Sequence, residues 1–291
     1  MYQALYRKYR SQTFGQLVGQ QVVARTLRQA VEQEKISHAY LFSGPRGTGK
    51  TSVAKIFAKA MNCPNQVNGE PCNECYICES ITNGSLEDVI EIDAASNNGV
   101  DEIRDIRDKS TYAPSLAKHK VYIIDEVHML STGAFNALLK TLEEPTENVV
   151  FILATTELHK IPATILSRVQ RFEFKSIKLP DIVHHLESIL ATEGIAYEAD
   201  AVQIIARRAE GGMRDALSIL DQALSLTAGS ELTTAIAEEI TGSISLAALD
   251  QYVAAILAHD ATAALDQLAI IFDNGKNMAR FVTDLLQYLR D

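Results

Sequence analysis

The segment "GPRGTGKT" has the residue types and spacing of a loop that binds nucleotide phosphates. It spans residues 44–51, follows the apolar run "AYLFS" and leads into a helical pattern, which is the context that this motif requires. Glycines let backbone N–H groups approach phosphates, and a helix N-terminus favours negative charge. Lys50 is expected to reach the β- and γ-phosphates, and Thr51 to place its hydroxyl on Mg²⁺. The alternative is a chance glycine-rich turn.

The residues expected to contact the nucleotide in this loop are Gly44, Pro45, Arg46, Gly47, Thr48, Gly49, Lys50, Thr51 and Ser52.

The stretch "VYIIDEVH" carries the acidic residues that such a site needs. Asp125 follows four apolar residues at the expected end of a strand, where a carboxylate can hold magnesium. Its neighbour Glu126 is predicted to polarise the attacking water as a general base. The alternative is an acidic pair that only ends a strand and opens a loop.

All four cysteines of the chain lie within "CPNQVNGEPCNECYIC", with the spacing C-x₈-C-x₂-C-x₂-C. Four thiolates satisfy tetrahedral Zn²⁺ and leave no open position, so Cys63, Cys72, Cys75 and Cys78 predict a structural zinc site. An iron–sulfur cluster is the chemical alternative, because C-x₂-C-x₂-C also occurs there. Unliganded core cysteines are the third reading, but the segment is rich in Asn, Glu, Gly and Pro and has little core of its own.

The elements that must position these residues follow from hydrophobic periodicity. Five short apolar runs, "HAYLFS", "DVIEIDA", "HKVYIIDE", "NVVFILATT" and "RFEFK", alternate with helical patterns between residue 20 and about residue 175. Such alternation predicts an α/β fold, in which helices cover both faces of a parallel sheet. The cysteine stretch lies between the helix that follows the phosphate loop and the next strand.

Beyond "KLPD" the pattern is helical throughout, with a Gly-Gly turn at residues 211–212 and breaks near "LTAGSE" and "TGSIS". We expect a nucleotide-binding domain at residues 1–178 with a zinc module at 63–78, an all-helical domain at 179–242, and the start of a third helical domain at 243–291. The last helical pattern shows no stop signal, which favours a chain that is part of something longer.

Composition limits the classes of function. The formal charge of −10 argues against a protein that coats nucleic acid with its whole surface, although a local basic face remains open. The apolar runs are far shorter than a bilayer requires, and no secretory signal follows Met1. The default location is therefore the cytoplasm, with no membrane partner, where clustered thiols favour metal over disulfides.

Several longer stretches resemble one known family closely. The segments "HAYLFSGPRGTGKTS", "IEIDAASNNGVDEIR", "KVYIIDEVHMLS", "FNALLKTLEEP" and "LATTE", with "YRKYRSQTFGQLVGQ" and "GGMRDALSILDQA", are similar to the gamma/tau subunits of bacterial DNA polymerase III. These subunits are the ATP-driven motors of the sliding-clamp loader, within the AAA+ class of P-loop NTPases. The resemblance covers essentially the whole chain. It implies an AAA+ domain with a zinc-binding insertion, a helical lid domain and the start of a helical collar.

The resemblance also implies roles for three residues outside the phosphate loop. Thr155, in "LATTE", corresponds to the first sensor of the γ-phosphate. Arg168, in "LSRVQRF", corresponds to the arginine that a subunit offers to the ATP of its neighbour, although Val169 stands where the family usually has cysteine. Arg214, in "GGMRDALS", corresponds to the second sensor. Without the resemblance, each arginine would read as an ordinary solvated side chain.

The opening segment resembles the part of the family that borders adenine and ribose. Tyr6, Arg10 and Val18 occupy the corresponding positions, and Ser11 replaces the usual proline. The alternative for these three residues is packing of the N-terminus.

The implied function is ATP binding and hydrolysis that load a sliding clamp onto primed DNA, in a pentameric spiral of this chain with delta and delta-prime type subunits. The implied cofactors are ATP, Mg²⁺ and Zn²⁺. Polymerisation would belong to a partner chain, and contacts with polymerase and helicase to a tail beyond residue 291. Asn97 and Asn98 are candidate DNA contacts, with a simple turn as the alternative.

Two other functions remain as alternatives. One is a nucleic-acid-binding zinc module on a vestigial nucleotide fold, which the full set of nucleotide residues disfavours. The other is a related AAA+ DNA remodeller such as a branch-migration motor, which the cysteine insertion and "NALLKTLEEP" disfavour.

Overall fold

The computed structural model describes residues 3–227, 231–273 and 275–290, and the chain divides into two units. One unit comprises residues 10–178, and the other comprises residues 3–9 together with the chain from residue 179 onward. Each unit has its own core and is described by itself.

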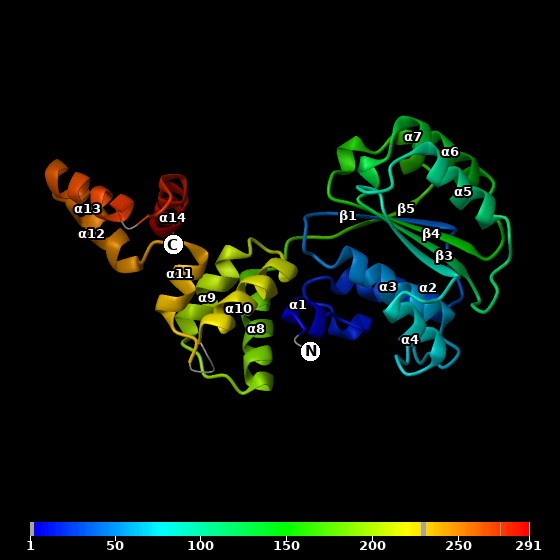
Figure 1. Cartoon of the computed structure of the whole chain (residues 1–291), viewed down its shortest axis with the longest axis horizontal. Helices are drawn as coiled ribbons and strands as arrows, with labels where there is room; N and C mark the ends of the chain where they lie inside the picture. Colours follow the sequence, from blue (N-terminus) through cyan, green and yellow to red (C-terminus); the bar gives the residue numbers. More distant parts are fainter. Residues whose placement is uncertain (1–2, 228–230, 274, 291) are drawn as a thin grey trace. The chain divides into compact units, whose positions relative to one another are not determined.

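The first unit is built on a parallel five-stranded sheet with the order β2-β3-β4-β1-β5 (Figure 1). The strands are β1 (Ala39–Ser43), β2 (Val89–Asp93), β3 (Lys120–Asp125), β4 (Val149–Thr155) and β5 (Gln170–Glu173). Each overlaps one of the five apolar runs, with β5 beginning one residue earlier than predicted, so the predicted α/β fold with a parallel sheet is confirmed. The three central strands are almost wholly buried because helices cover both faces of the sheet.

One face of the sheet packs against α2 (Gln21–Glu32) and α3 (Lys50–Asn62), and the other against α5 (Val100–Ser110), α6 (Thr132–Glu143) and the short α7 (Ala163–Leu166) (Figure 1). Alternate residues of β3 serve the two layers: Val121 and Ile123 join the first core, and Tyr122 and Ile124 the second. Two apolar cores therefore hold the sheet from both sides.

The predicted insertion lies between α3 and β2. It consists of a loop that starts at Cys63 and the helix α4 (Tyr76–Asn83), which ends at Gly84 in a left-handed conformation with φ 72°. The side chain of Cys75 accepts a hydrogen bond from the backbone N–H of Cys78 and so caps α4. Three single-turn 3₁₀ helices complete the unit: η1 (Phe14–Gln16), η2 (Val127–Met129) and η3 (Leu158–Lys160).

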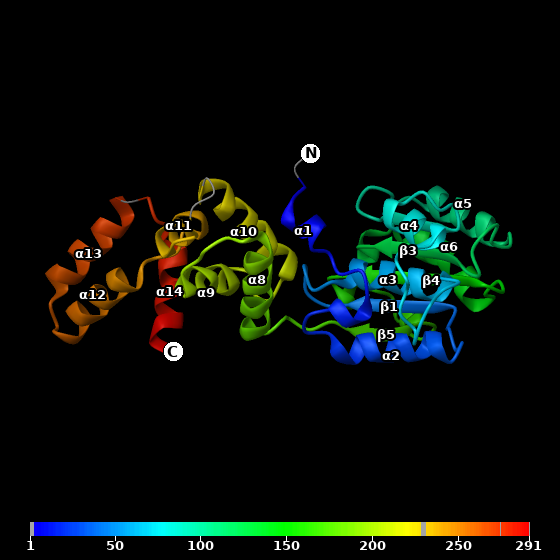
Figure 2. The same ribbon diagram turned by 90° about the horizontal axis from the view of Figure 1, so that it is seen from below.

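The second unit is helical. It contains α1 (Leu5–Lys8), α8 (Leu179–Glu193), α9 (Ala199–Arg208), α10 (Met213–Thr227), α11 (Thr234–Thr241), α12 (Leu246–Leu257), α13 (Ala261–Asp273) and α14 (Met278–Arg290), shown from a second side in Figure 2. The Gly-Gly turn separates α9 from α10, whereas the expected break at residues 228–230 lies outside the described residues. Ile244, Leu249, Ile271 and Phe281 form a separate small core among the last helices.

Residues 3–9 belong to this helical unit, although the sequence places them with the nucleotide-binding domain. The reason is contact: α1 packs on α10, and Lys8 forms an ion pair with Glu193 of α8, with Nζ 2.6 Å from Oε1. The hydroxyl of Tyr9 also donates to Glu193.

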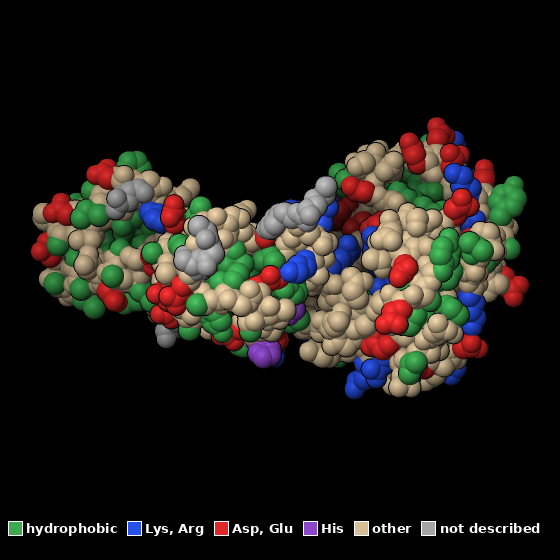
Figure 3. Space-filling view, turned by 60° about the horizontal axis from the view of Figure 1, so that its bottom comes forward, with side chains coloured by type: hydrophobic (Ala, Val, Ile, Leu, Met, Phe, Trp, Pro, Cys, Tyr) green, Lys and Arg blue, Asp and Glu red, His purple; other side chains and the backbone are tan. Residues whose placement is uncertain are grey.

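The formal net charge is −10, and acidic and basic side chains are interspersed on the face drawn in Figure 3. Within the described residues, no single helix has the length and apolar composition needed to cross a bilayer. Only the bent pair α11 and α12 satisfies that test jointly.

Candidate nucleotide site and cysteine cluster

The phosphate loop connects the carboxyl end of β1 to the N-terminus of α3. At Gly44 (φ 146°) an added Cβ would lie 2.2 Å from the carbonyl oxygen of Phe174, so only glycine fits there. Gly49 (φ 99°) precedes the first turn of α3, whose backbone N–H groups have no partners within the helix. Close approach of backbone to ligand and a free helix N-terminus are the features that an anion site needs.

Lys50 is almost fully buried in this loop. Its Nζ donates hydrogen bonds to the carbonyl oxygens of Gly44 (2.9 Å) and Pro45 (2.8 Å). Burial lowers the pKa of Lys50, while the negative charges of Glu126 and Asp125 act in the opposite direction. A cation is thus held within the loop that is expected to receive the phosphates.

The two predicted magnesium ligands are in direct contact. The hydroxyl of Thr51 donates to Oδ2 of Asp125 over 2.6 Å, although 74 residues separate them. Asp125 ends β3, and the carboxyl ends of parallel strands are where open α/β sheets bind ligands. A hydroxyl and a carboxylate oxygen are suitable ligands for Mg²⁺, so these residues fit the ion.

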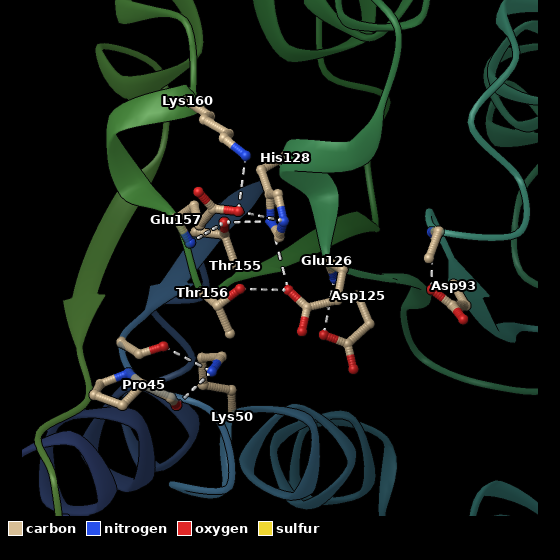
Figure 4. A network of polar contacts seen from close by, with 12 residues as sticks. Pro45, Lys50, Asp93, Asp125, Glu126, His128, Thr155, Thr156, Glu157 and Lys160 are labelled. Atoms are coloured by element: carbon tan, nitrogen blue, oxygen red, sulfur yellow. Dashed lines mark hydrogen bonds and ion pairs between the residues drawn. The ribbon is translucent and has the colours of Figure 1, made fainter. Parts of the chain in front are cut away.

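Glu126, the predicted general base, lies next to Asp125 in a left-handed conformation (φ 47°, ψ 44°). For a residue other than glycine this conformation costs about 1–3 kcal/mol, so the surrounding structure must hold it. Two contacts do so (Figure 4): the Thr156 hydroxyl donates to Oε2 of Glu126 over 3.0 Å, and Nδ1 of His128 lies 3.4 Å from the same oxygen.

The imidazole of His128 is buried at the centre of this network (Figure 4). Nδ1 lies 3.0 Å from the hydroxyl of Thr155, the predicted first sensor, and Nε2 lies 3.3 Å from a carboxylate oxygen of Glu157. Glu157 in turn accepts a hydrogen bond from Lys160 over 2.9 Å. The side chain thus links the end of β3 to the end of β4.

Sequence reasoning missed His128 and Thr156. The available signals were weak: Thr156 adjoins Thr155 in "LATTE", and His128 follows Asp125 by three residues in "DEVH". Neither spacing shows that both side chains converge on Glu126.

The structure places Arg168 just after α7, half-buried. Its guanidinium pairs with Glu143 of α6 over 2.8 Å and donates to the carbonyl oxygen of Thr164 over 2.7 Å. The side chain is therefore held near the surface, and its role toward a neighbouring subunit stays a prediction.

The predicted residues of the opening segment fall in different units. In the helical unit the Arg214 guanidinium lies over the Tyr6 ring, 5.4 Å from its centroid, so these two predicted residues are neighbours. In the α/β unit Nε of Arg10 donates to the Ser52 hydroxyl, in the first turn of α3, over 2.9 Å. Val18 is half-buried in the same unit.

The stretch that contains Asn97 and Asn98 forms a turn before α5. The backbone N–H of Asn97 donates to the carbonyl oxygen of Asp93 over 3.0 Å, and its side-chain amide donates to the same oxygen over 3.1 Å. Both asparagines are exposed. The turn is thus present, and contact with DNA stays a prediction.

The four cysteine thiols lie together in the insertion. Their sulfur atoms are all within 4.8 Å of one another, and Sγ of Cys63 lies 3.4 Å from that of Cys72 and 3.9 Å from that of Cys75. A tetrahedron with Zn–S bonds of about 2.3 Å has sulfur atoms about 3.8 Å apart. The cysteines are free of disulfides, so the donor set fits a closed zinc site.

Electrostatic conditions around the thiols differ. A hydrogen bond from the backbone of Glu74 lowers the pKa of Cys72 to about 7, whereas burial raises the pKa of Cys63 and of Cys78. Lys59 of α3 is buried beside them; burial lowers its pKa, and the thiol of Cys78 acts to raise it. A buried ammonium next to the cluster would offset the excess negative charge of four thiolates around Zn²⁺.

Two family models match the chain. One, described as "DNA polymerase III, delta subunit", matches residues 19–178, and the other, described as "DNA polymerase III clamp loader subunit, ATPase lid domain", matches residues 181–229.

Similar curated proteins include DNA polymerase III subunit tau of Bacillus subtilis, 57% identical over 290 residues, which cover 100% of this chain and 51% of that protein. Subunit tau of Escherichia coli is 51% identical over 235 residues, which cover 81% of this chain and 36% of that protein. The chain thus spans about half the length, or less, of these curated relatives.

Among solved structures, the Thermotoga maritima RuvB Holliday junction branch migration motor is similar, with a TM-score of 0.58 and 17% sequence identity. The match covers 86% of this chain and 80% of that one. Identity this low supports the fold alone.

Proposed function

Because the chain belongs to the family of DNA polymerase III clamp-loader subunits that includes the tau and gamma/tau proteins, we propose that it is an ATPase motor of a bacterial sliding-clamp loader. The observation that carries the proposal is the convergence of Lys50, the bonded pair Thr51 and Asp125, and the restrained Glu126 at one edge of the sheet. This set suits nucleotide hydrolysis with Mg²⁺, which would neutralise charge on the phosphates.

Each side chain of the set has a separate task. Lys50 supplies a buried positive charge for the β- and γ-phosphates, and Thr51 and Asp125 would hold Mg²⁺. Glu126 accepts the proton of the attacking water, and Thr156 and His128 fix its orientation. Thr155 would sense the γ-phosphate, since its hydroxyl shares His128 with Glu126.

We assign Arg168 to the nucleotide of an adjacent subunit. Its guanidinium is already positioned by Glu143 and the Thr164 carbonyl near the surface, which limits the freedom that it would lose on contact with phosphate. Removal of an arginine supplied in trans typically lowers turnover about 10³–10⁵-fold, so hydrolysis would require assembly. Arg214 and Tyr6 would contribute from the lid to the nucleotide of their own subunit.

The partners follow from the same proposal. They are further copies of this chain, delta and delta-prime type subunits, the sliding clamp and primer-template DNA, in the cytoplasm. Exposed apolar side chains on α12–α14 support assembly through these helices; they are Leu246, Ile256, Leu257, Leu265, Ile270, Phe272, Val282, Leu286 and Leu289. We assign DNA polymerisation to a partner chain.

We assign the four cysteines to a structural Zn²⁺ site and not to an iron–sulfur cluster, because the proposed reaction needs no redox step. Metal analysis is expected to find about one zinc and little iron per chain. Iron in place of zinc would overturn the assignment.

The test of the function is nucleotide binding and turnover by Lys50→Ala. We expect this variant to lose ATP binding, and the unaltered chain, assembled with its partner subunits, to hydrolyse ATP faster when clamp and primed DNA are added. Unchanged ATP affinity in Lys50→Ala would overturn the proposal. Capture of a junction-binding protein in place of the clamp would favour a branch-migration motor, which the identity of 57% to a tau subunit disfavours.

A further inference from the structure

The cysteine insertion is bonded to the segment that precedes α2. Glu70, between the first two cysteines, accepts hydrogen bonds on its two carboxylate oxygens from the backbone N–H groups of Phe14 (Oε2, 2.8 Å) and Gly15 (Oε1, 3.0 Å). These contacts join residues more than 50 positions apart in the chain. They fix the first residues of η1 to the insertion.

Lys59 makes a second connection. Its Nζ donates to the side-chain oxygen of Gln12 over 2.7 Å and to that of Asn73, between Cys72 and Cys75, over 2.6 Å. Lys59 lies on α3, the helix that begins at the phosphate loop, and it is buried. The ammonium group of Lys59 therefore connects α3 to the cysteine loop at Asn73 and to residues 10–16 at Gln12.

The opposite end of the same segment reaches the nucleotide site. Arg10 donates to Ser52, which directly follows the magnesium residue Thr51. Within the segment, the Gln12 amide donates to the Arg10 carbonyl over 3.0 Å, and Gln16 accepts from the Gln12 backbone N–H over 2.8 Å. Residues 10–16 are thus internally bonded, with the phosphate-loop helix at one end and the insertion at the other.

The loop of the insertion also packs closely against α2. A Cβ added to Gly69 (φ 72°) would lie 2.4 Å from the carbonyl oxygen of Arg28 on α2. The loop before Glu70 consequently packs against backbone, and Glu70 has little freedom to leave the N–H groups that it accepts from.

We propose that Glu70 and Lys59 couple metal occupancy of the cysteine cluster to nucleotide affinity, by holding residues 10–16 against the first turn of α3. The four cysteines fix the loop that carries Glu70 and Asn73, and this loop in turn fixes the backbone that carries Arg10. Glu70 and Lys59 are positioning residues, since neither is placed at the reacting atoms. The inference rests on the proposed function in one respect, that the loop at residues 44–51 binds ATP.

The experiment measures affinity for a nonhydrolysable ATP analogue by calorimetry, with the 291-residue chain in zinc-loaded and zinc-free form. Zinc is stripped with a chelator, which is then removed by gel filtration into magnesium buffer, and Cys75→Ser provides a second route to a metal-free cluster. We expect zinc removal to weaken affinity about fivefold or more, the lower range of typical coupling between sites, and zinc addition to restore it in the unaltered chain.

The decisive variant is Glu70→Ala, because replacement of the buried Lys59 endangers folding itself. With zinc bound, Glu70→Ala should already show most of the loss in affinity. Zinc removal should then change the affinity of this variant less than about twofold, which is below the usual range for coupled sites. Glu70→Gln, which keeps one acceptor oxygen, should lie between the two. Glu79→Gln, an exposed carboxylate of the same insertion, is the matched control and should retain the full zinc effect.

Amide hydrogen exchange supplies a readout that does not depend on nucleotide. Residues 12–17 should lose protection on zinc removal and in Glu70→Ala. The proposal is overturned if the unaltered chain binds the analogue equally well with and without zinc, or if Glu70→Ala keeps the same zinc dependence. Failure of the proposed function looks different: the zinc-loaded chain would then bind the analogue no better than Lys50→Ala.

Discussion

Two regions of the α/β unit are held in place by different means. One is the nucleotide edge, which comprises the phosphate loop and the strand ends at Asp125 and Thr155. The other is the cysteine insertion, which follows the phosphate-loop helix in the sequence. The phosphate loop, Asp125 and Thr155 lie at the ends of strands that two apolar cores hold in place. The insertion contributes only a few buried side chains, among them Cys63, Cys78 and Ile81, and gathers four thiols where a core would otherwise lie. The first region is positioned by packing, and the second is suited to positioning by a metal.

Because the two regions are held differently, they are sensitive to different substitutions. Polar side chains at the nucleotide edge can be replaced while the sheet stays folded, because the two apolar cores hold the strands that carry them. If the four thiols of the insertion hold Zn²⁺ as proposed, loss of a single thiolate would remove a constraint that no apolar packing replaces. Residues 10–16 are bonded to both regions, since Arg10 donates to Ser52 of α3 and the backbone N–H of Phe14 donates to Glu70.

The largest effect is expected at the nucleotide edge. Glu126→Gln should lower ATP turnover by the assembled complex about 10²–10⁴-fold, because the proposed general base is lost, while ATP affinity and thermal stability stay near those of the unaltered protein. Steady-state turnover and calorimetry measure the two properties. Glu147→Gln, an exposed carboxylate of the same unit, is the control. Turnover within threefold of the control, about 0.7 kcal/mol, would exclude Glu126 as the base.

Zinc removal should unfold the insertion locally, while the sheet stays folded. If thiolate ligation is the main constraint on the insertion, as proposed, residues 63–83 should lose amide protection first, and β1, β3 and β4 should keep theirs. Hydrogen exchange followed by mass spectrometry, before and after chelation, separates the regions. Simultaneous loss of protection in the sheet would show that the two regions are stabilised as one.

A substitution at a buried carboxylate next to β2 tests the stability of the sheet independently of the cysteine insertion. Asp88 precedes β2 and accepts hydrogen bonds from the backbone N–H groups of Ser115, Leu116 and Ala117. Asp88→Asn should lower the free energy of unfolding at pH 7 by about 1.5–3 kcal/mol, the usual range for bonds to a charged group. Urea unfolding measures the change, and zinc content should stay the same.

The pH dependence of that effect has a definite sign. Burial alone would raise the pKa of Asp88, but the bonds from Ala117, Leu116 and Ser115 lower it overall. The folded pKa is thus below the unfolded value of about 3.9, so the stability contribution is complete above about pH 4 and is lost as pH falls through the folded pKa. The difference between Asp88→Asn and the unaltered protein should shrink on acidification. A constant difference down to pH 2 would contradict this origin.

The smallest effect is expected at His128. His128→Ala should lower turnover about tenfold, equivalent to about 1.4 kcal/mol, with little change in the affinity for ATP, because His128 orients Glu126 and Thr155 and does not itself hold phosphate. His128→Asn, which can still bond to one neighbour, should recover part of the loss. His159→Ala is the matched control, since His159 is exposed and faces the same Glu157. Equal effects at both histidines would remove the special role of His128.

Much of the candidate site could be read from the sequence because its signals are local. The glycines and Lys50 lie within eight residues, Asp125 ends an apolar run, and the cysteines are separated by short loops. Alternating strand and helix patterns also predicted the parallel sheet, since each period reflects contacts within a single element. Neither the order of the strands nor the grouping of residues 3–9 with the helical unit has such a local signal.

Residue types and short spacings therefore sufficed to predict the chemistry: a loop suited to phosphate, an acidic strand end and four thiols in a stretch with little core. The way in which these parts are joined is visible in the folded chain alone. Thr156 meets Glu126, Arg10 meets Ser52, and Glu70 meets the backbone at Phe14. The physical reason is that hydrogen bonds between residues tens of positions apart depend on how strands and loops pack together, and no spacing along the chain encodes that packing.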